Sequence, residues 1–199
     1  MNTFKQFLAA CLLCSGLGYT TASSAAVVNL SLSSPAQVGA TFTVDVLVSD
    51  LFAGLASNEE LLAFGMTVAN SSPGLFSFTG SSIAALFDDD SALVGLAAAG
   101  SVFPGIQNQP ANQSILLATL TFYALDSGSG TLGIRSDLND PNQGLIFLQS
   151  TPLNLNADLA VTVAPVPLPA ALPLLLAGVS LFAGFAQRRR GGAASDGAV

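Results

Sequence analysis

Carboxylates are the side chains with which this chain could do chemistry. Glu59 and Glu60 are adjacent, and Asp88, Asp89 and Asp90 form a run. Paired carboxylates can hydrolyse glycosides, and several carboxylate oxygens can hold Ca²⁺. However, adjacent residues point in different directions, and no acid stands in an apolar pattern that would raise its pKa. The run also lacks the alternating ligands and central glycine of an EF-hand loop. We therefore expect solvated, non-catalytic acids, with no metal site assigned and calcium left open as the only cofactor.

Other catalytic groups are missing from the sequence. The chain has no histidine, and its only cysteines are Cys11 and Cys14, which a cleaved leader would remove. Ser-His-Asp, Cys-His and zinc-hydrolase sites are therefore excluded, and we predict that the protein is not an enzyme. Asn29, Asn70 and Asn112 begin Asn-x-Ser/Thr triplets, which also arise by chance.

Charge is distributed unevenly along the chain. Residues 27–164 carry eleven acidic side chains against Arg135 alone, a net charge of −10. A surface of that sign repels phosphate backbones, which argues against nucleic acid as a partner.

The residue pattern of this region indicates β-strands throughout. In Thr41–Ser49 and again over residues 153–163, apolar and polar residues alternate with period two, as in half-buried strands. The residues expected to face the core are Phe42, Val44, Val46 and Val48 in the first strand, and Leu153, Leu155, Ala157, Leu159, Val161 and Val163 in the second.

Further strands are expected over residues 27–32, 61–69, 75–79, 93–98, 114–124, 131–134 and 145–148, and one short helix over residues 81–87. The expected inward residues are Phe64, Met66, Val68, Leu116, Ala118, Leu120 and Phe122. Turns rich in Gly, Pro, Asn and Asp separate these runs. The spacing predicts an all-β, two-sheet antiparallel sandwich that occupies residues 27–164 as one domain.

The first 26 residues have the organisation of a secretory signal peptide. Lys5 supplies the positive charge, residues 7–19 form the apolar core, and small residues place the cleavage after Ala25 or Ala26. Residues 8–11 look like a lipoprotein lipobox, but they come too early in the leader for lipidation.

A second apolar segment lies near the C-terminus. Residues 166–186 carry no charged side chain, and Arg188, Arg189 and Arg190 follow at once. A helix over residues 170–186 would be about 26 Å long, which is close to the ~30 Å hydrocarbon core of a bilayer. The arginines would then remain in the cytoplasm by the positive-inside rule, so that the upstream domain faces outward.

This tail resembles the PEP-CTERM sorting signals of Gram-negative bacteria. The resemblance is carried by the motif Val166, Pro167, Leu168, Pro169 and Ala170, the apolar span and the arginine cluster, in that order. It implies processing by an exosortase, which passes the upstream protein to the cell surface or extracellular matrix. Residues 165–190 are the expected sorting tail, and residues 191–199 a disordered extension. The alternative is an ordinary C-terminal membrane anchor.

The central domain is similar to cohesin domains at two places. Residues 28–49 have the short strand, glycine turn and Phe-Thr-Val strand with which cohesins open, and residues 114–134 have the leucine-rich strand ending in Phe and a glycine turn. The resemblance implies a non-enzymatic jelly-roll sandwich of a type that binds dockerins. Residues 68–73 depart from the cohesin pattern, so no contact residue is carried over.

Together these observations predict a secreted, non-catalytic binding or adhesion module. It would be anchored in the membrane until its tail is cleaved, and then displayed on the cell surface or in the matrix of a Gram-negative bacterium. The expected partner is a surface protein. The alternative is a carbohydrate-binding module for exopolysaccharide, which the absence of tryptophan disfavours. The phenylalanines are mostly expected in the core.

Overall fold

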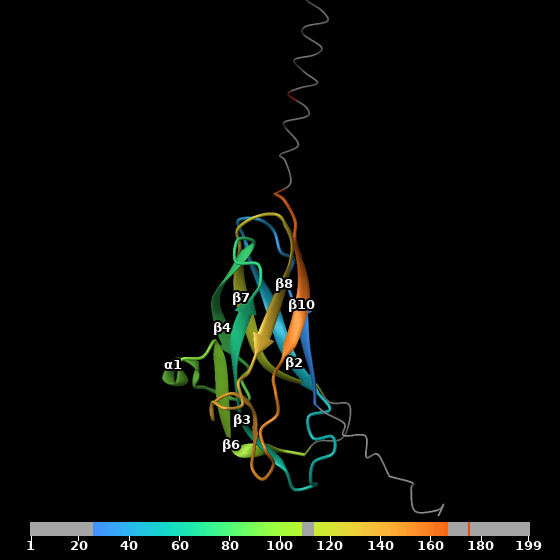
Figure 1. The fold of residues 1–199 in the computed structure, drawn as a ribbon, viewed down its shortest axis with the longest axis vertical. Helices are drawn as coiled ribbons and strands as arrows, with labels where there is room; N and C mark the ends of the chain where they lie inside the picture. Colours follow the sequence, from blue (N-terminus) through green and yellow to red (C-terminus); the bar gives the residue numbers. More distant parts are fainter. Residues whose placement is uncertain (1–25, 109–113, 167–174, 176–199) are drawn as a thin grey trace, which may run out of the picture.

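The computed structural model describes residues 26–108, 114–166 and 175. These residues form a β-sandwich with one short helix, shown in Figure 1. The strands are β1 (Val27–Leu32), β2 (Thr41–Ser49), β3 (Glu60–Asn70), β4 (Phe76–Ile83), β5 (Asp88–Asp89), β6 (Ala98–Gln107), β7 (Ile115–Ala124), β8 (Gly128–Arg135), β9 (Gly144–Phe147) and β10 (Ala157–Val163), and the helix is α1 (Ser91–Val94).

The strands form two antiparallel sheets. The four-stranded sheet has the order β1-β2-β7-β4, and the six-stranded sheet has the order β10-β8-β3-β6-β5, with β9 also paired to β3. Strand β3 is central, because β6 pairs with one of its edges while β9 and then β8 pair with the other. The predicted two-sheet antiparallel sandwich is confirmed.

The core lies between the sheets and is built by alternation along the strands. Phe42, Val44, Val46 and Val48 are all fully buried, as predicted. The Phe42 ring stacks on Phe122 with 5.5 Å between centroids. Burying a side chain of this size contributes roughly 1.5–3 kcal/mol relative to leaving it exposed. Phe64 and Met66 are buried as expected, and Val68 packs against the core.

Two predicted elements between β4 and β6 are wrong. Residues 81–83, expected to begin a helix, continue β4, because Ser81 and Ile83 pair with Leu120 and Ala118 of β7. Residues 93–98, which were expected to form a strand, instead contain the end of α1 and the segment that leads to β6. The helix ends at Gly95, whose φ of 71° is a left-handed conformation that glycine adopts without a Cβ penalty. Strand β6 begins after it and was not predicted.

One predicted side-chain direction and one predicted strand bound are also wrong. Leu116 is 37% exposed, whereas its neighbour Leu117 is fully buried. The cause is a register shift between β2 and β7 at Val46 and Leu47, which places one extra residue in β7. Strand β10 begins at Ala157, whereas Leu153 makes a single bridge to Leu145.

The described ends of the domain lie at opposite ends of the sandwich. Strand β1 starts at the lower end in Figure 1, and β10 leaves at the upper end. Among the described residues, Ala164 is the last that pairs with the sandwich, and its N–H donates to Ala36 O. Of the sorting motif only Val166 is described, and its side chain is 60% exposed.

The other predicted segments lie outside the described residues. These are Ala25, Pro167, Leu168, Pro169, Ala170 and the arginine cluster Arg188, Arg189 and Arg190. Ala26 is described and packs against the core. Within the described ranges, no helix has the length and apolar character needed to cross a membrane.

Candidate binding face

The outer face of the six-stranded sheet is built from small side chains. Asp88, Ser101, Ala63 and Ile146 stand opposite one another in one row across β5, β6, β3 and β9. Because successive side chains alternate between faces, the next row points Phe64 into the core. The outward row therefore combines short side chains in its middle with a carboxylate at one end.

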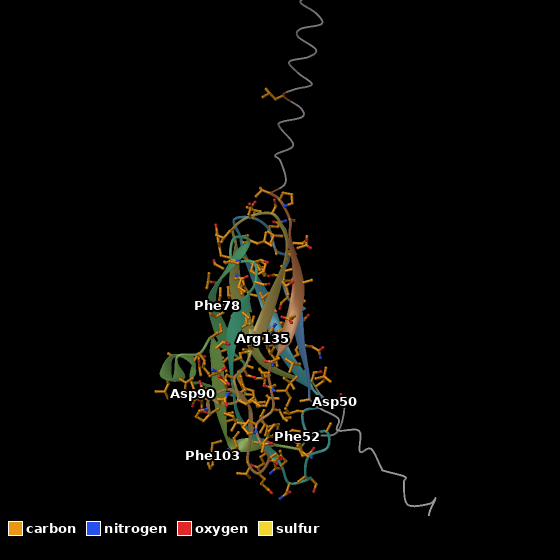
Figure 2. All side chains as sticks on the ribbon, in the orientation of Figure 1. Asp50, Phe52, Phe78, Asp90, Phe103 and Arg135 are labelled. Carbon is orange, nitrogen blue, oxygen red and sulfur yellow. The ribbon has the colours of Figure 1, made fainter. Side chains whose placement is uncertain are left out.

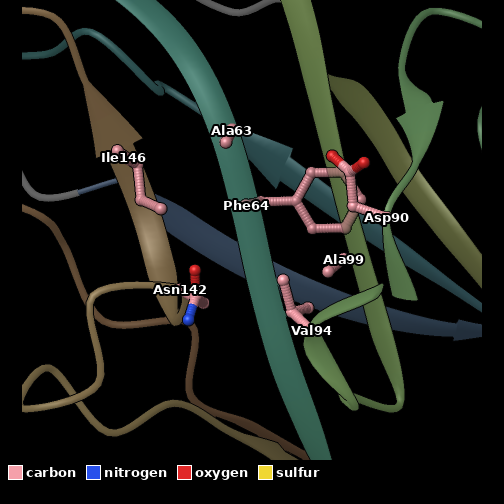
Figure 3. A pocket seen from close by; sticks show the side chains of 8 residues that line it. Ala63, Phe64, Asp90, Val94, Ala99, Asn142 and Ile146 are labelled. Carbon is pink, nitrogen blue, oxygen red and sulfur yellow. The ribbon is translucent and has the colours of Figure 1, made fainter. Parts of the chain in front are cut away.

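A loop and a helix partly cover these small residues. A Cβ built on Gly65 would lie 1.9 Å from Asn142 O and 2.8 Å from Leu96 Cδ1, so the β8–β9 loop lies directly over Gly65. Between this loop and α1 a cavity of about 70 Å³ remains. Figure 3 shows its lining, which consists of Ala63, Phe64, Asp90, Val94, Ala99, Gly100, Asn142 and Ile146.

One ionisable side chain, Asp90, lines this cavity. Its Oδ2 accepts a hydrogen bond from Ser101 Oγ at 2.5 Å. The N–H groups of Leu93 and Val94 donate to Asp90 O, so the residue also anchors α1. Hydrogen bonds from both β6 and α1 therefore hold Asp90 in place.

Further carboxylates flank the cavity on both sides. The hydroxyl and the N–H of Ser91 both lower the pKa of Asp89. Across the cavity, the N–H of Asn142 and then the side-chain amide of Gln143 lower the pKa of Asp140. Both carboxylates are therefore charged at neutral pH, and the surroundings of the cavity are anionic.

Large apolar side chains project into solvent around the same sheet. Phe103 of β6 is 96% exposed, Leu93 of α1 is 84% exposed and Leu148, just after β9, is 53% exposed. Phe103 is labelled at the lower part of the sandwich in Figure 2. Exposed aromatic residues of this kind are enriched in protein interfaces. The expectation that phenylalanines belong to the core does not hold for Phe103.

Glu59 is not the solvated acid that the sequence predicted. It is 1% exposed and directly precedes β3. Its Oε1 accepts from the N–H groups of Gln149 (2.9 Å) and Glu60 (3.2 Å), and its Oε2 accepts from Ser150 Oγ. Burial raises the pKa of Glu59, but these hydrogen bonds together hold it below the ordinary value. Glu59 thus fastens the segment after β9 to the edge of β3.

The remaining candidate carboxylates lie beside different parts of β6. Asp88 and Asp89 are exposed in β5, and Glu60 pairs with Gln107 at the far end of β6. Over residues 26–108 and 114–166, no group of three or more potential ligands could hold a metal ion.

Of the glycosylation triplets, Asn70 has both ends of its side chain engaged. Its Nδ2 donates to Phe76 O and its Oδ1 accepts from the N–H of Ser72. Asn29 lies in β1, and Asn112 lies outside the described residues.

Comparison with solved structures finds cohesins. The chain is similar to a cohesin module from a Clostridium perfringens family 33 glycoside hydrolase, with 12% identity, 71% of this chain and 98% of that chain covered, and a TM-score of 0.48. It is also similar to the third cohesin of ScaC from Acetivibrio cellulolyticus in complex with the ScaB dockerin. The identity is 13%, 68% of this chain and 99% of that chain are covered, and the TM-score is 0.41. No family model and no curated protein matches the chain.

Sequence reasoning did not find this face because its elements were misassigned. Small residues at outward positions, Ala63, Gly65 and Ala99, were a signal that another part of the protein approaches closely. That signal becomes readable only once β6 is recognised beside β3.

Proposed function

We propose that the domain is a non-catalytic, cohesin-like module that binds a protein partner through the outer face of the six-stranded sheet. The observation that carries this proposal is the exposure of Phe103 in β6, Leu93 in α1 and Leu148 just after β9, three segments that belong to or adjoin the six-stranded sheet. When a partner removes large exposed apolar side chains from water, the free energy falls and the complex is stabilised. The four-stranded sheet also exposes large side chains, Val27, Leu32, Leu116 and Tyr123, but none of them beyond 46%.

A capture experiment with the full chain tests the binding face. The wild-type protein and the Phe103→Ser/Leu93→Ser variant would be cross-linked to the extracellular fraction of the source bacterium, and captured proteins quantified by mass spectrometry. Tyr123→Ser provides the control, because Tyr123 is an exposed aromatic residue of the four-stranded sheet. We expect one specific partner to be lost in the first variant and retained in the control. Equal capture by all three proteins would rule out this face.

The same proposal includes secretion and sorting. Residues 1–26 would direct export, and an exosortase would process the chain at Val166–Ala170 for display at the cell surface or in the matrix. Processing at this place is supported by the position of Ala164, which lies two residues before Val166 and is the last described residue hydrogen-bonded to the sandwich. The mass of the protein recovered from the cell surface tests this step. A C-terminus near residues 165–170 supports sorting, whereas an intact tail through Val199 indicates a plain membrane anchor.

A second candidate function is binding of exopolysaccharide on the opposite face. Tyr123 is 38% exposed there, beside threonine hydroxyls that could bond to sugars. Retardation of the full chain in gels containing the polysaccharide would favour this function, provided that Tyr123→Ser removes the retardation and Phe103→Ser does not.

A further inference from the structure

The size of the cavity between α1 and the β8–β9 loop limits what can enter it. Its volume of about 70 Å³ is less than half of the ~150 Å³ that holds benzene. A narrow group therefore fits better than a wide one. The terminal methylene and ammonium of a lysine are small enough to enter, whereas an aromatic ring needs the larger volume.

The lining suits a group that is apolar along its stem and cationic at its tip. Ala63, Val94, Ala99 and Ile146 offer carbon atoms to a methylene chain. The Asp90 carboxylate has several lone-pair sites, and the Ser101 hydroxyl occupies one of them. Lysine places its stem on apolar surface and keeps its charge at the end in this way.

The electrostatic surroundings also favour a cation. Asp88 and Asp89 precede Asp90 on one side of the cavity, and Asp137 and Asp140 belong to the loop on the other side. The only basic residue of 27–164, Arg135, is already bonded to Asp158 at 2.6 Å. No basic side chain of the domain therefore neutralises these carboxylates.

A second copy of the domain cannot supply the lysine. The only lysine of the whole chain is Lys5, which belongs to the predicted signal peptide. Two acidic faces of the same kind would also repel each other. The occupant must come from a different molecule.

We propose that this cavity receives a lysine side chain of the protein partner, whose ammonium pairs with Asp90 while its methylenes contact Ala63, Ala99 and Ile146. This inference rests on the proposed function and specifies the chemistry of the partner. The exposed apolar residues supply contact area, and the cavity selects a partner with a lysine at the matching position. Charge complementarity of this kind gives specificity more than affinity.

A titration of the ¹⁵N-labelled full chain tests the inference without the natural partner. The probe is the peptide acetyl-Gly-Lys-Gly-amide, and its Nε-acetylated form has the same stem without the charge. We expect saturable amide shifts confined to the residues around Val94, Ala99 and Asn142 with the first peptide and none with the second. Equal shifts with both peptides, or shifts spread over acidic residues elsewhere, would overturn the inference.

Three variants sharpen the titration. Asp90→Asn keeps the shape and an acceptor for Ser101, and should weaken the lysine peptide roughly tenfold or more. Ala63→Leu fills the cavity and should abolish the shifts. Asp45→Asn is the matched control, because Asp45 on the other sheet also accepts a hydrogen bond from a hydroxyl group. The donor is Thr119 Oγ1, at 2.7 Å. The ¹⁵N spectrum of each variant shows directly whether it is folded.

The results separate this inference from the proposed function. A partner that depends on Phe103 but binds Asp90→Asn and Ala63→Leu as tightly as wild type would overturn the lysine site and leave the proposed function standing. Specific, Asp90-dependent binding of the lysine peptide supports the site even when the capture experiment finds no partner dependent on Phe103.

Discussion

The outer faces of the two sheets differ in the side chains that meet the solvent. On the four-stranded sheet, polar residues of neighbouring strands stand side by side, as in the pairs Thr43–Thr121 and Asp45–Thr119. On the six-stranded sheet the corresponding positions are alanine, glycine and isoleucine, with α1 and the β8–β9 loop above them.

This difference distinguishes the proposed binding side of the sandwich from the opposite side. Threonine suits a strand through its branched Cβ, and its hydroxyl can bond to water at an exposed position. Small residues leave room that other atoms must fill. Part of that room is filled by Leu96 and the Asn142 backbone, and the remainder is the cavity beside Asp90.

The largest expected effect comes from adding one methyl group to each face. Gly65→Ala should lower the free energy of unfolding by about 3 kcal/mol, since its Cβ would meet a backbone oxygen that cannot move without displacing the loop. Gly80→Ala on β4 should change it by less than about 0.5 kcal/mol, because nothing lies within 4 Å of that Cβ. Urea unfolding measures both. Equal effects would mean that the loop does not lie tightly over the sheet.

A smaller loss of stability is expected from neutralising Glu59, the buried carboxylate directly before β3. Glu59→Gln should lower the free energy of unfolding by about 2 kcal/mol at neutral pH, because the Gln149 N–H and Ser150 hydroxyl lose a charged acceptor. Asp45→Asn on the opposite face should lower it by less than about 1 kcal/mol, since only one hydroxyl is involved.

The effect of Glu59→Gln should also depend on pH. Because the folded-state pKa of Glu59 is depressed, its contribution is present above the unfolded pKa and lost as pH falls through the folded pKa. The difference between wild type and variant should therefore be full at pH 7 and shrink once the pH drops below the ordinary glutamate range. A difference that stays constant down to pH 3 would contradict a role for the charge.

Removing exposed aromatic side chains should separate binding from stability. Phe103→Ser should leave the unfolding free energy within about 0.5 kcal/mol of wild type, because the ring is 96% exposed, and weaken partner binding by roughly tenfold. Tyr123→Ser on the other sheet should leave partner binding unchanged. Surface plasmon resonance with the captured partner gives the affinities, and a stronger effect at Tyr123 would transfer the binding site to the four-stranded sheet.

The smallest expected effect concerns the polar half of the six-stranded sheet. Arg135 and Asp158 form an ion pair across β8 and β10 with side chains 43% and 54% exposed. Asp158→Asn should lower the free energy of unfolding by about 0.5 kcal/mol, and less in high salt, because solvent screens exposed pairs. Thermal unfolding at two salt concentrations measures it. A loss above about 2 kcal/mol would mean that the pair is effectively buried.

The sequence alone was sufficient for the strand over Thr41–Ser49, whereas the equally regular pattern over residues 153–163 forms a strand only from Ala157. Thr41–Ser49 was predicted with its exact bounds and its four buried residues, because the period-two pattern reports locally which face is buried. The two-sheet arrangement followed, since such strands can bury their apolar faces only against each other. Secretion and sorting stay predictions, because they rest on segments outside the described residues.

Only the tertiary structure decided which surface could bind and which acid is buried. Glu59 looked like any exposed acid until the chain brought Gln149 and Ser150 to it from ninety residues away. Leu117 replaced Leu116 in the core because the register of β2 against β7 shifts by one residue. Asp90 came to line a cavity because β6, α1 and the β8–β9 loop meet there. Alternation is a local property and can be read from neighbours, whereas register, burial of a single carboxylate and the covering of a sheet depend on contacts between distant segments.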